Sequence, residues 1–141
     1  MLTQLRIHHL RNLYAISLEL SQINWVVGNN GTGKTSLLEA VFLLSRGKSF
    51  RHHQPKHYIS QGRDFCAVWA NSTQGTLAIQ KQLGSDKGLE STLLKINEQT
   101  VQSQSMLSYA LPVLLLDPSG MAVLEEGSSS RRQLLDWLVF H

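Results

Sequence analysis

The chain contains few cysteine, aromatic and charged residues. Among 141 residues it has one cysteine, with 7% aromatic and 16% charged residues. Cys66 can form no internal disulfide and has no partner at zinc-ligand spacing, so we expect it to be a buried small residue. The longest apolar runs, such as residues 111–116, are too short to cross a bilayer, and the N-terminus lacks a signal-peptide pattern. These absences predict a cytoplasmic chain without a membrane segment.

The remaining composition is that of a globular domain. Apolar residues make up 42% of the chain and the formal net charge is +3, which suits one domain with its own core. Neither an internal repeat nor a low-complexity tract is visible. His52, His53 and His57 are clustered, but no carboxylate or cysteine accompanies them. A solvated loop is therefore expected there, rather than a metal site.

One segment constrains the chemistry more than any other, because it fits the pattern G-x-x-x-x-G-K-S/T of a phosphate-binding loop. An apolar run at residues 23–27 precedes it and apolar residues at helical spacing follow it, so we expect the order strand, loop, helix. We predict an ATP or GTP site formed by Gly28, Asn29, Asn30, Gly31, Thr32, Gly33, Lys34 and Thr35.

Each residue type in this loop has a chemical role. Its glycines permit backbone conformations that other residues avoid and let the backbone approach phosphate oxygens. Backbone N–H groups of residues 30–35 and the start of the following helix would attract the anion. Lys34 would supply a full charge to the β- and γ-phosphates, and the Thr35 hydroxyl would be a ligand for Mg²⁺. The alternative is a glycine-rich turn that caps a helix without any ligand.

The order of expected elements is that of an α/β domain with a β-rich insertion. A hairpin is expected at residues 5–10 and 14–20, and the helix from Lys34 to about Ser45 should end at Gly47. Residues 48–62 are expected to form a loop. Further strands are predicted at 65–71, 75–83, 89–96 and 99–102 in a small antiparallel sheet, with a weak helix at 105–110, a buried strand at 113–116, a short helix at 121–125 and a helix from Ser130.

A basic segment follows the phosphate-loop helix. Residues 46–63 contain no acidic residue, and such a segment can bind phosphate backbone without sequence preference. A solvated loop is the alternative, which the sequence alone slightly favours. No aromatic-rich patch suggests stacking on single-stranded bases, so duplex DNA is the better candidate. The candidate DNA-binding residues are Arg46, Lys48, Arg51 and Lys56.

Five segments resemble the RecF family of bacterial DNA replication and repair proteins. They are residues 1–20 with Leu10-Arg11-Asn12, 28–40, 48–51, 116–118 and 126–136. The resemblance implies a P-loop ATPase head of the ABC/SMC type without a long coiled coil. Residues 1–124 would form the N-terminal part of the ATPase lobe. Residues 125–141 would begin a helical lobe. We expect the chain to be cut within the helix that starts at Ser130.

The resemblance also implies a function. Members of this family bind ATP, dimerise around it, recognise DNA at junctions of duplex and single-strand gaps, and help RecO and RecR to place RecA. This serves recombinational repair, replication restart and the SOS response. The preference for ATP over GTP is inferred from the resemblance alone. Arg11 and Asn12 would lie beside the nucleotide, with an ordinary hairpin turn as the alternative, and Ser36 would join the loop residues.

Turnover is expected to be negligible in this chain. The family hydrolyses ATP slowly, with a second acidic motif and a partner-supplied signature, and neither is present here. Asp117 follows an apolar run as in the acidic motif, but Pro118 stands where the catalytic Glu would be. A strand end with a turn is the expected role of Asp117, and a Mg²⁺ role is the alternative.

Three other classes of protein remain possible. A small-molecule kinase uses the same loop, but the β-rich stretch 65–101 is a poor lid. An ABC transporter ATPase subunit would need a membrane partner, and residues 48–51 and Arg131-Arg132 do not fit it. A purely structural fragment would bind no nucleotide through Lys34.

Overall fold

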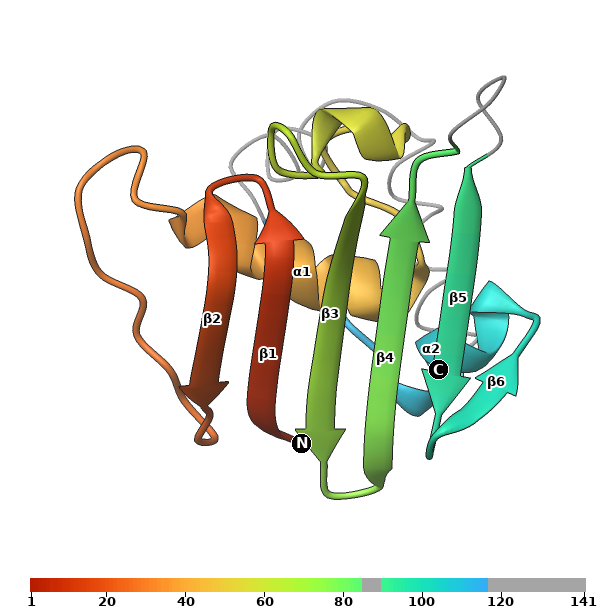
Figure 1. Cartoon of the computed structure of the whole chain (residues 1–141). Helices are drawn as coiled ribbons and strands as arrows, with labels where there is room; N and C mark the ends of the chain where they lie inside the picture. Colours follow the sequence, from red (N-terminus) through yellow and green to blue (C-terminus); the bar gives the residue numbers. More distant parts are fainter. Residues whose placement is uncertain (85–89, 117–141) are drawn as a thin grey trace, which may run out of the picture.

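The strands form one antiparallel sheet, with the order β2-β1-β3-β4-β5-β6 in the part of the chain that the structure describes (Figure 1). The structure is a computed structural model and describes residues 1–84 and 90–116. The predicted hairpin and the predicted later strands are parts of this one sheet. The strands are β1 Leu2–Leu10, β2 Leu13–Glu19, β3 Phe65–Ser72, β4 Gly75–Gln82, β5 Ser91–Ile96 and β6 Gln99–Val101.

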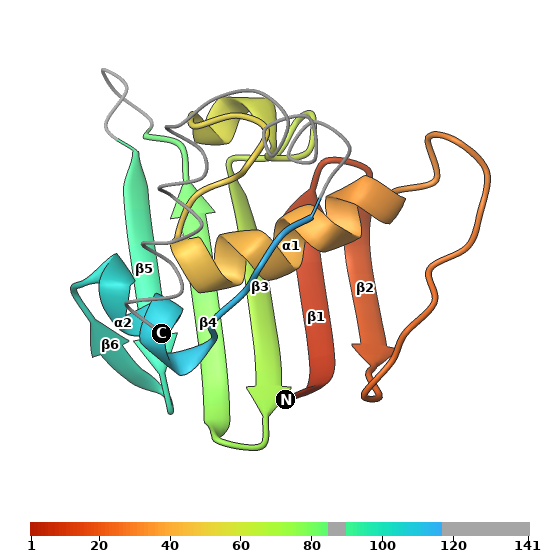
Figure 2. The ribbon, with the colours of Figure 1, turned by 180° about the vertical axis from the view of Figure 1, so that it is seen from behind.

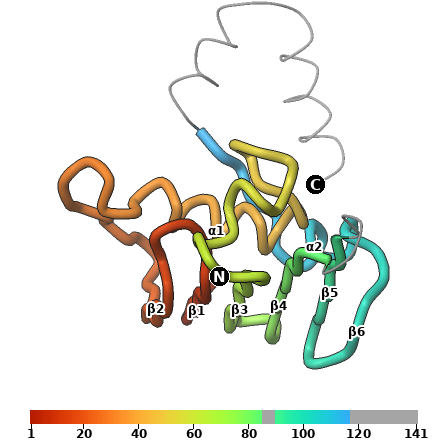
Figure 3. Tube along the Cα trace, turned by 45° about the horizontal axis from the view of Figure 1, so that its top comes forward, coloured from red at the N-terminus to blue at the C-terminus, as the bar shows by residue number. Residues whose placement is uncertain are grey.

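Helix α1, Lys34–Arg46, crosses one face of the sheet, as Figure 2 shows from behind and Figure 3 shows with the top of the molecule tilted forward. It ends at Gly47, whose left-handed conformation (φ 69°) and N–H bond to the carbonyl of Leu43 close the last turn. A glycine suits this position because it has no Cβ to oppose a positive φ. The helix and its stop at Gly47 confirm the prediction from sequence.

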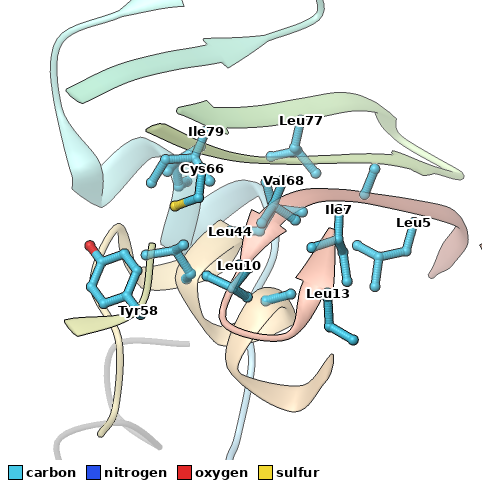
Figure 4. Close-up of a cluster of buried hydrophobic side chains, with 14 of the residues drawn as sticks. Leu5, Ile7, Leu10, Leu13, Leu44, Tyr58, Cys66, Val68, Leu77 and Ile79 are labelled. Atoms are coloured by element: carbon cyan, nitrogen blue, oxygen red, sulfur yellow. The ribbon is translucent and has the colours of Figure 1, made fainter. Parts of the chain in front are cut away.

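The core lies between α1 and the sheet (Figure 4). Alternate residues of β1, β3 and β4 point toward the helix, as the two-residue repeat of a strand requires. Among them Ile7, Val68 and Ile79 are buried, and Leu44 faces them from α1. Burial of each such side chain contributes about 1.5–3 kcal/mol. Cys66 is also fully buried in this core, as predicted.

The segment before the phosphate loop differs from the prediction. Residues 23–27 form no strand, and the connection from β2 to α1 swings away from the sheet edge (Figure 1). Instead, Asn24 closes a local turn, donating from Nδ2 to the carbonyl of Ser21 and accepting from the Ser21 N–H. Strand preference depends on packing against neighbours, and the described residues provide no neighbour for this run. The predicted strand at 23–27 is therefore wrong for this structure.

The C-terminal part of the described chain holds a second difference. Residues 113–116 are extended but belong to no strand, and Leu116 is 72% exposed, so the predicted buried strand is wrong. The segment crosses α1 on the side away from the sheet (Figure 2), where it has no strand to pair with. The short helix α2, Gln104–Ala110, precedes it and confirms the weak helical signal.

Other predictions concern residues outside the described ranges. These are Asp117, the helix at 121–125 and the helix from Ser130. In the predicted loop 48–62, Pro55–His57 form a short 3-10 helix, η1. No helix in residues 1–84 and 90–116 is long and apolar enough to cross a membrane.

Candidate nucleotide site

The phosphate-loop segment is an exposed turn that leads into α1. Thr32 folds back on the loop, its hydroxyl donating to the carbonyl of Asn29 at 2.8 Å. Lys34 Nζ donates to the carbonyls of Gly28 and Asn29, at 2.7 Å each. The lysine charge therefore lies across the loop backbone, on the loop side of the helix.

Two glycines of the loop are required by its geometry. Gly33 precedes the helix with φ 104°, and a Cβ there would lie 2.8 Å from Leu13 Cδ2. Gly28 has φ 155°, and its Cβ would lie 2.9 Å from Thr32 Oγ1. Real Cβ atoms do not approach other atoms so closely, so any side chain at either position would change the loop. The sequence pattern thus has a direct steric cause.

The start of α1 has no side-chain cap. Gly33 occupies the N-cap position, where serine, threonine or aspartate would normally bind the first N–H groups. The first N–H groups of an α-helix lack intrahelical acceptors. They therefore remain directed at the loop side of the helix, where they carry its positive dipole end. Thr35, in the first turn, is exposed, whereas Ser36 is buried.

The β1–β2 turn packs directly against this helix. Asn12 Nδ2 donates to the carbonyl of Gly31 at 3.0 Å, and Asn12 Oδ1 accepts from Ser36 Oγ at 3.1 Å. Arg11 has a positive φ of 52° and turns its guanidinium toward α1 rather than into the loop. The structure thus brings Asn12 to the loop, whereas the Arg11 side chain binds Glu39 on α1 and the carbonyl of His57.

The acceptor of Arg11 is a residue that sequence reasoning missed. Glu39 is fully buried on α1, and it accepts from Arg11 Nε at 2.5 Å and from Arg11 Nη2 at 2.9 Å. Ser49 Oγ donates to the same carboxylate. A signal was available, because Glu39 stands between Ser36 and Leu43 at helical spacing. A carboxylate on the buried face of a helix calls for a buried partner.

The candidate DNA-binding residues lie on the segment that follows α1. Arg46 ends the helix and is half-buried, whereas Lys48, Arg51 and Lys56 are exposed. Arg51 Nη1 is 4.0 Å from Glu39 Oε2, so one of the four basic residues lies near the carboxylate that binds Arg11. His52 and His57 place their rings 5.3 Å apart. Within residues 1–84 and 90–116, no cluster of three potential metal ligands is found.

Comparison with known proteins places these features in a family. The model of the RecF/RecN/SMC N terminal domain matches residues 1–119. The DNA replication and repair protein RecF of Acinetobacter baylyi is 44% identical over 141 residues, covering 99% of this chain and 38% of that protein. The corresponding protein of Histophilus somni is 39% identical, with 99% and 39% covered. The chain thus spans less than two fifths of the length of these relatives.

Solved structures agree with this result. The recombination mediator protein RecF-ATP in the RecFOR pathway is similar with a TM-score of 0.72 at 26% identity, covering 96% of this chain and 38% of that one. The RecF-ATPrS structure of the same pathway gives 0.77 at 26% identity, with 99% and 38% covered. The expected fold, an N-terminal ATPase-head domain of the SMC type with an antiparallel sheet, is therefore confirmed. The chain belongs to the RecF/RecN/SMC N-terminal domain family, and the relatives named above are RecF proteins.

Proposed function

We propose that this chain binds ATP with Mg²⁺ at residues 28–35, as the ATP-binding part of a cytoplasmic DNA repair protein. One observation carries the proposal: an uncapped helix N-terminus meets a glycine turn over which Lys34 Nζ lies. The turn leaves its backbone exposed, and the lysine supplies a full positive charge. Oriented N–H groups, a helix dipole and a cation together favour a polyphosphate over a neutral ligand.

The residues present fit a nucleotide. Gly28 and Gly33 allow the loop to follow its present course, because a Cβ at either position would come within 3 Å of Thr32 or Leu13. Lys34 would exchange its two carbonyl acceptors for phosphate oxygens, which are stronger partners because they carry charge. The exposed Thr35 hydroxyl would be a ligand for Mg²⁺, which usually keeps few protein ligands beside phosphate oxygens and water. ATP bound there would supply the charge that holds the metal.

The neighbouring residues have smaller roles in this proposal. Asn12 would fix the loop through Gly31 and lie next to the nucleotide, and Ser36 would hold Asn12 in place. Arg11 would come close to the nucleotide while it remains bound to Glu39. We assign no residue to hydrolysis. We propose negligible turnover here and slow hydrolysis in a longer ATP-dependent dimer, in which residues 1–124 belong to the ATPase lobe and 125–141 open the helical lobe.

The family supports a proposal for the biological role. The relatives are DNA replication and repair proteins, and a structural neighbour is a recombination mediator of the RecFOR pathway. We propose that a protein with this domain recognises duplex DNA at single-strand gaps and helps load a recombinase together with RecO and RecR. It would act in recombinational repair, replication restart and the SOS response. A small-molecule kinase and an ABC transporter subunit are less well supported by these relatives.

DNA binding has an observation of its own. Lys48, Arg51 and Lys56 are exposed on one segment. Arg11 Nη1 donates to the carbonyl of His57 in that segment at 3.0 Å, which links the segment to the β1–β2 turn beside the phosphate loop. Basic side chains without a specific base-reading geometry bind phosphate backbone, and their binding weakens steeply with salt. We propose that this segment, with Arg46, contacts the backbone of duplex DNA.

Calorimetric titration of the chain with Mg²⁺-ATP tests the proposed function. We expect binding that Lys34→Ala abolishes, because the variant removes the side-chain cation that lies over the loop. The matched control is Lys95→Ala, which removes a lysine from β5, a strand separated by β3 and β4 from the β1–β2 hairpin beside the loop. A folded wild-type chain that takes up no Mg²⁺-ATP, or a Lys34→Ala chain that binds as well as wild type, would refute the proposal. Duplex DNA, added in a second titration at two salt concentrations, tests the basic segment.

A further inference from the structure

Glu39 is the most enclosed charged side chain near the nucleotide site. Its relative exposure is 0%, although it lies only five residues after Lys34. Removing a carboxylate from water is costly unless charged and hydrogen-bonding partners replace the water. Glu39 has both, since the Arg11 guanidinium binds it through two nitrogens and the Ser49 hydroxyl donates to it.

The Arg11 backbone is held as firmly as its side chain. Its N–H donates to the carbonyl of Tyr58 at 2.7 Å, and its carbonyl accepts from Ser60 Oγ at 2.6 Å. A φ of 52° is unfavourable for a residue with a side chain and persists where surrounding contacts impose it. The ion pair with Glu39 is one of these contacts.

Helix α1 therefore holds the β1–β2 turn at two successive residues. Ser36 binds Asn12, and Glu39, three residues later on the same helix face, binds Arg11. Asn12 in turn donates to the carbonyl of Gly31 in the phosphate loop. A change at Glu39 would thus reach the loop through the turn, although no described contact joins Glu39 to the loop itself.

We propose that Glu39 is a positioning residue of the nucleotide site, which acts through Arg11. Its buried carboxylate fixes the guanidinium, and this places Asn12 on the phosphate loop. Glu39 does not touch the nucleotide. This inference rests on the proposed ATP binding at residues 28–35 and adds a residue outside the loop pattern to that site.

A double-mutant cycle separates this role from a merely structural ion pair. Glu39→Gln keeps the size of the side chain but removes its charge, and Arg11→Lys keeps the charge but removes the two-nitrogen fork. We expect each change to weaken Mg²⁺-ATP binding by about tenfold, and the double variant to bind about as weakly as either single one. Two independent effects would multiply instead to about a hundredfold.

Controls keep the result interpretable. Leu43→Ala removes a buried side chain from the same helix and alters neither partner of the Arg11–Glu39 pair, so it reports what loss of stability alone does to binding. We expect its ATP dissociation constant to stay within about twofold of wild type. If Glu39→Gln fails to fold, Glu39→Asp replaces it, because it keeps the charge and withdraws the carboxylate by one methylene.

The outcomes also distinguish this inference from the function on which it rests. If wild type binds ATP, Lys34→Ala does not, and a folded Glu39→Gln chain binds like wild type, only the positioning role is refuted. Losses that multiply in the double variant also refute it. If the folded wild-type chain binds no ATP, the proposed function fails and the role of Glu39 fails with it.

Discussion

The two sides of the phosphate loop are supported very differently. On the helix side, Ser36 and Glu39 are buried and bind the β1–β2 turn. On the other side, Ile23, Trp25 and Val27 are 75%, 87% and 86% exposed. The contacts described for that side are local, such as the turn between Ser21 and Asn24. One half of the site is built on packed structure, and the other half is held by local contacts.

This difference bears on affinity. A loop that is already fixed loses little conformational entropy when a ligand binds, whereas each residue that must be ordered costs about 1–2 kcal/mol. The helix side of the site is fixed before binding, because its contacts are internal to the fold. We therefore expect the cost of ordering residues 21–27, rather than residues of α1, to limit nucleotide affinity in this chain.

The largest expected contrast concerns the reactivity of Cys66. Burial raises the pKa of this thiol from 9.0 to about 12, and only the thiolate reacts with alkylating reagents. At pH 8 this lowers the thiolate fraction about 1000-fold relative to the unfolded chain. We expect iodoacetamide to modify Cys66 at least about 1000-fold more slowly in the folded chain than in denaturant at the same pH. Modification rates in the folded and the denatured chain that lie within tenfold of each other would show that the core around Cys66 opens readily.

The next contrast lies within α1. Leu44 is fully buried against the sheet, whereas Leu38 on the same helix is 50% exposed. Leu44→Ala should lower the free energy of unfolding by about 2–5 kcal/mol, because it leaves a cavity in the core. Leu38→Ala is the matched control and should change it by less than about 0.5 kcal/mol. Urea denaturation followed by circular dichroism measures both values, and equal losses would contradict the burial of Leu44.

Part of this structure could be predicted from residue patterns alone. The hairpin, α1 with its stop at Gly47, the strands after residue 65 and α2 follow from local signals: alternation, helical spacing and turn residues. These signals suffice because each element buries one face against a neighbour within the described chain. The phosphate loop could be recognised for a related reason, since one of its glycines, Gly28, is required by its contact with Thr32, four residues later.

The errors have the opposite cause. Residues 23–27 and 113–116 are apolar runs typical of strands buried on both faces, and such strands depend entirely on neighbours that a local pattern does not contain. Glu39 was missed in a similar way, because its partners Arg11 and Ser49 lie 28 residues before it and 10 residues after it. Local sequence patterns predict helices and strands. Contacts between residues that are distant in the sequence decide which of these elements pack and which charges are paired.

The smallest expected effect concerns the exposed side of the site. Trp25 is 87% exposed, so Trp25→Ser should remove almost no buried surface and should change the free energy of unfolding by less than about 0.5 kcal/mol. Urea denaturation of this variant beside Leu44→Ala compares the two regions under identical conditions. A loss above about 1 kcal/mol would mean that Trp25 packs against other parts of the chain in solution. In that case the segment before the loop would be supported like α1, and the limit on nucleotide affinity that we expect from residues 21–27 would no longer apply.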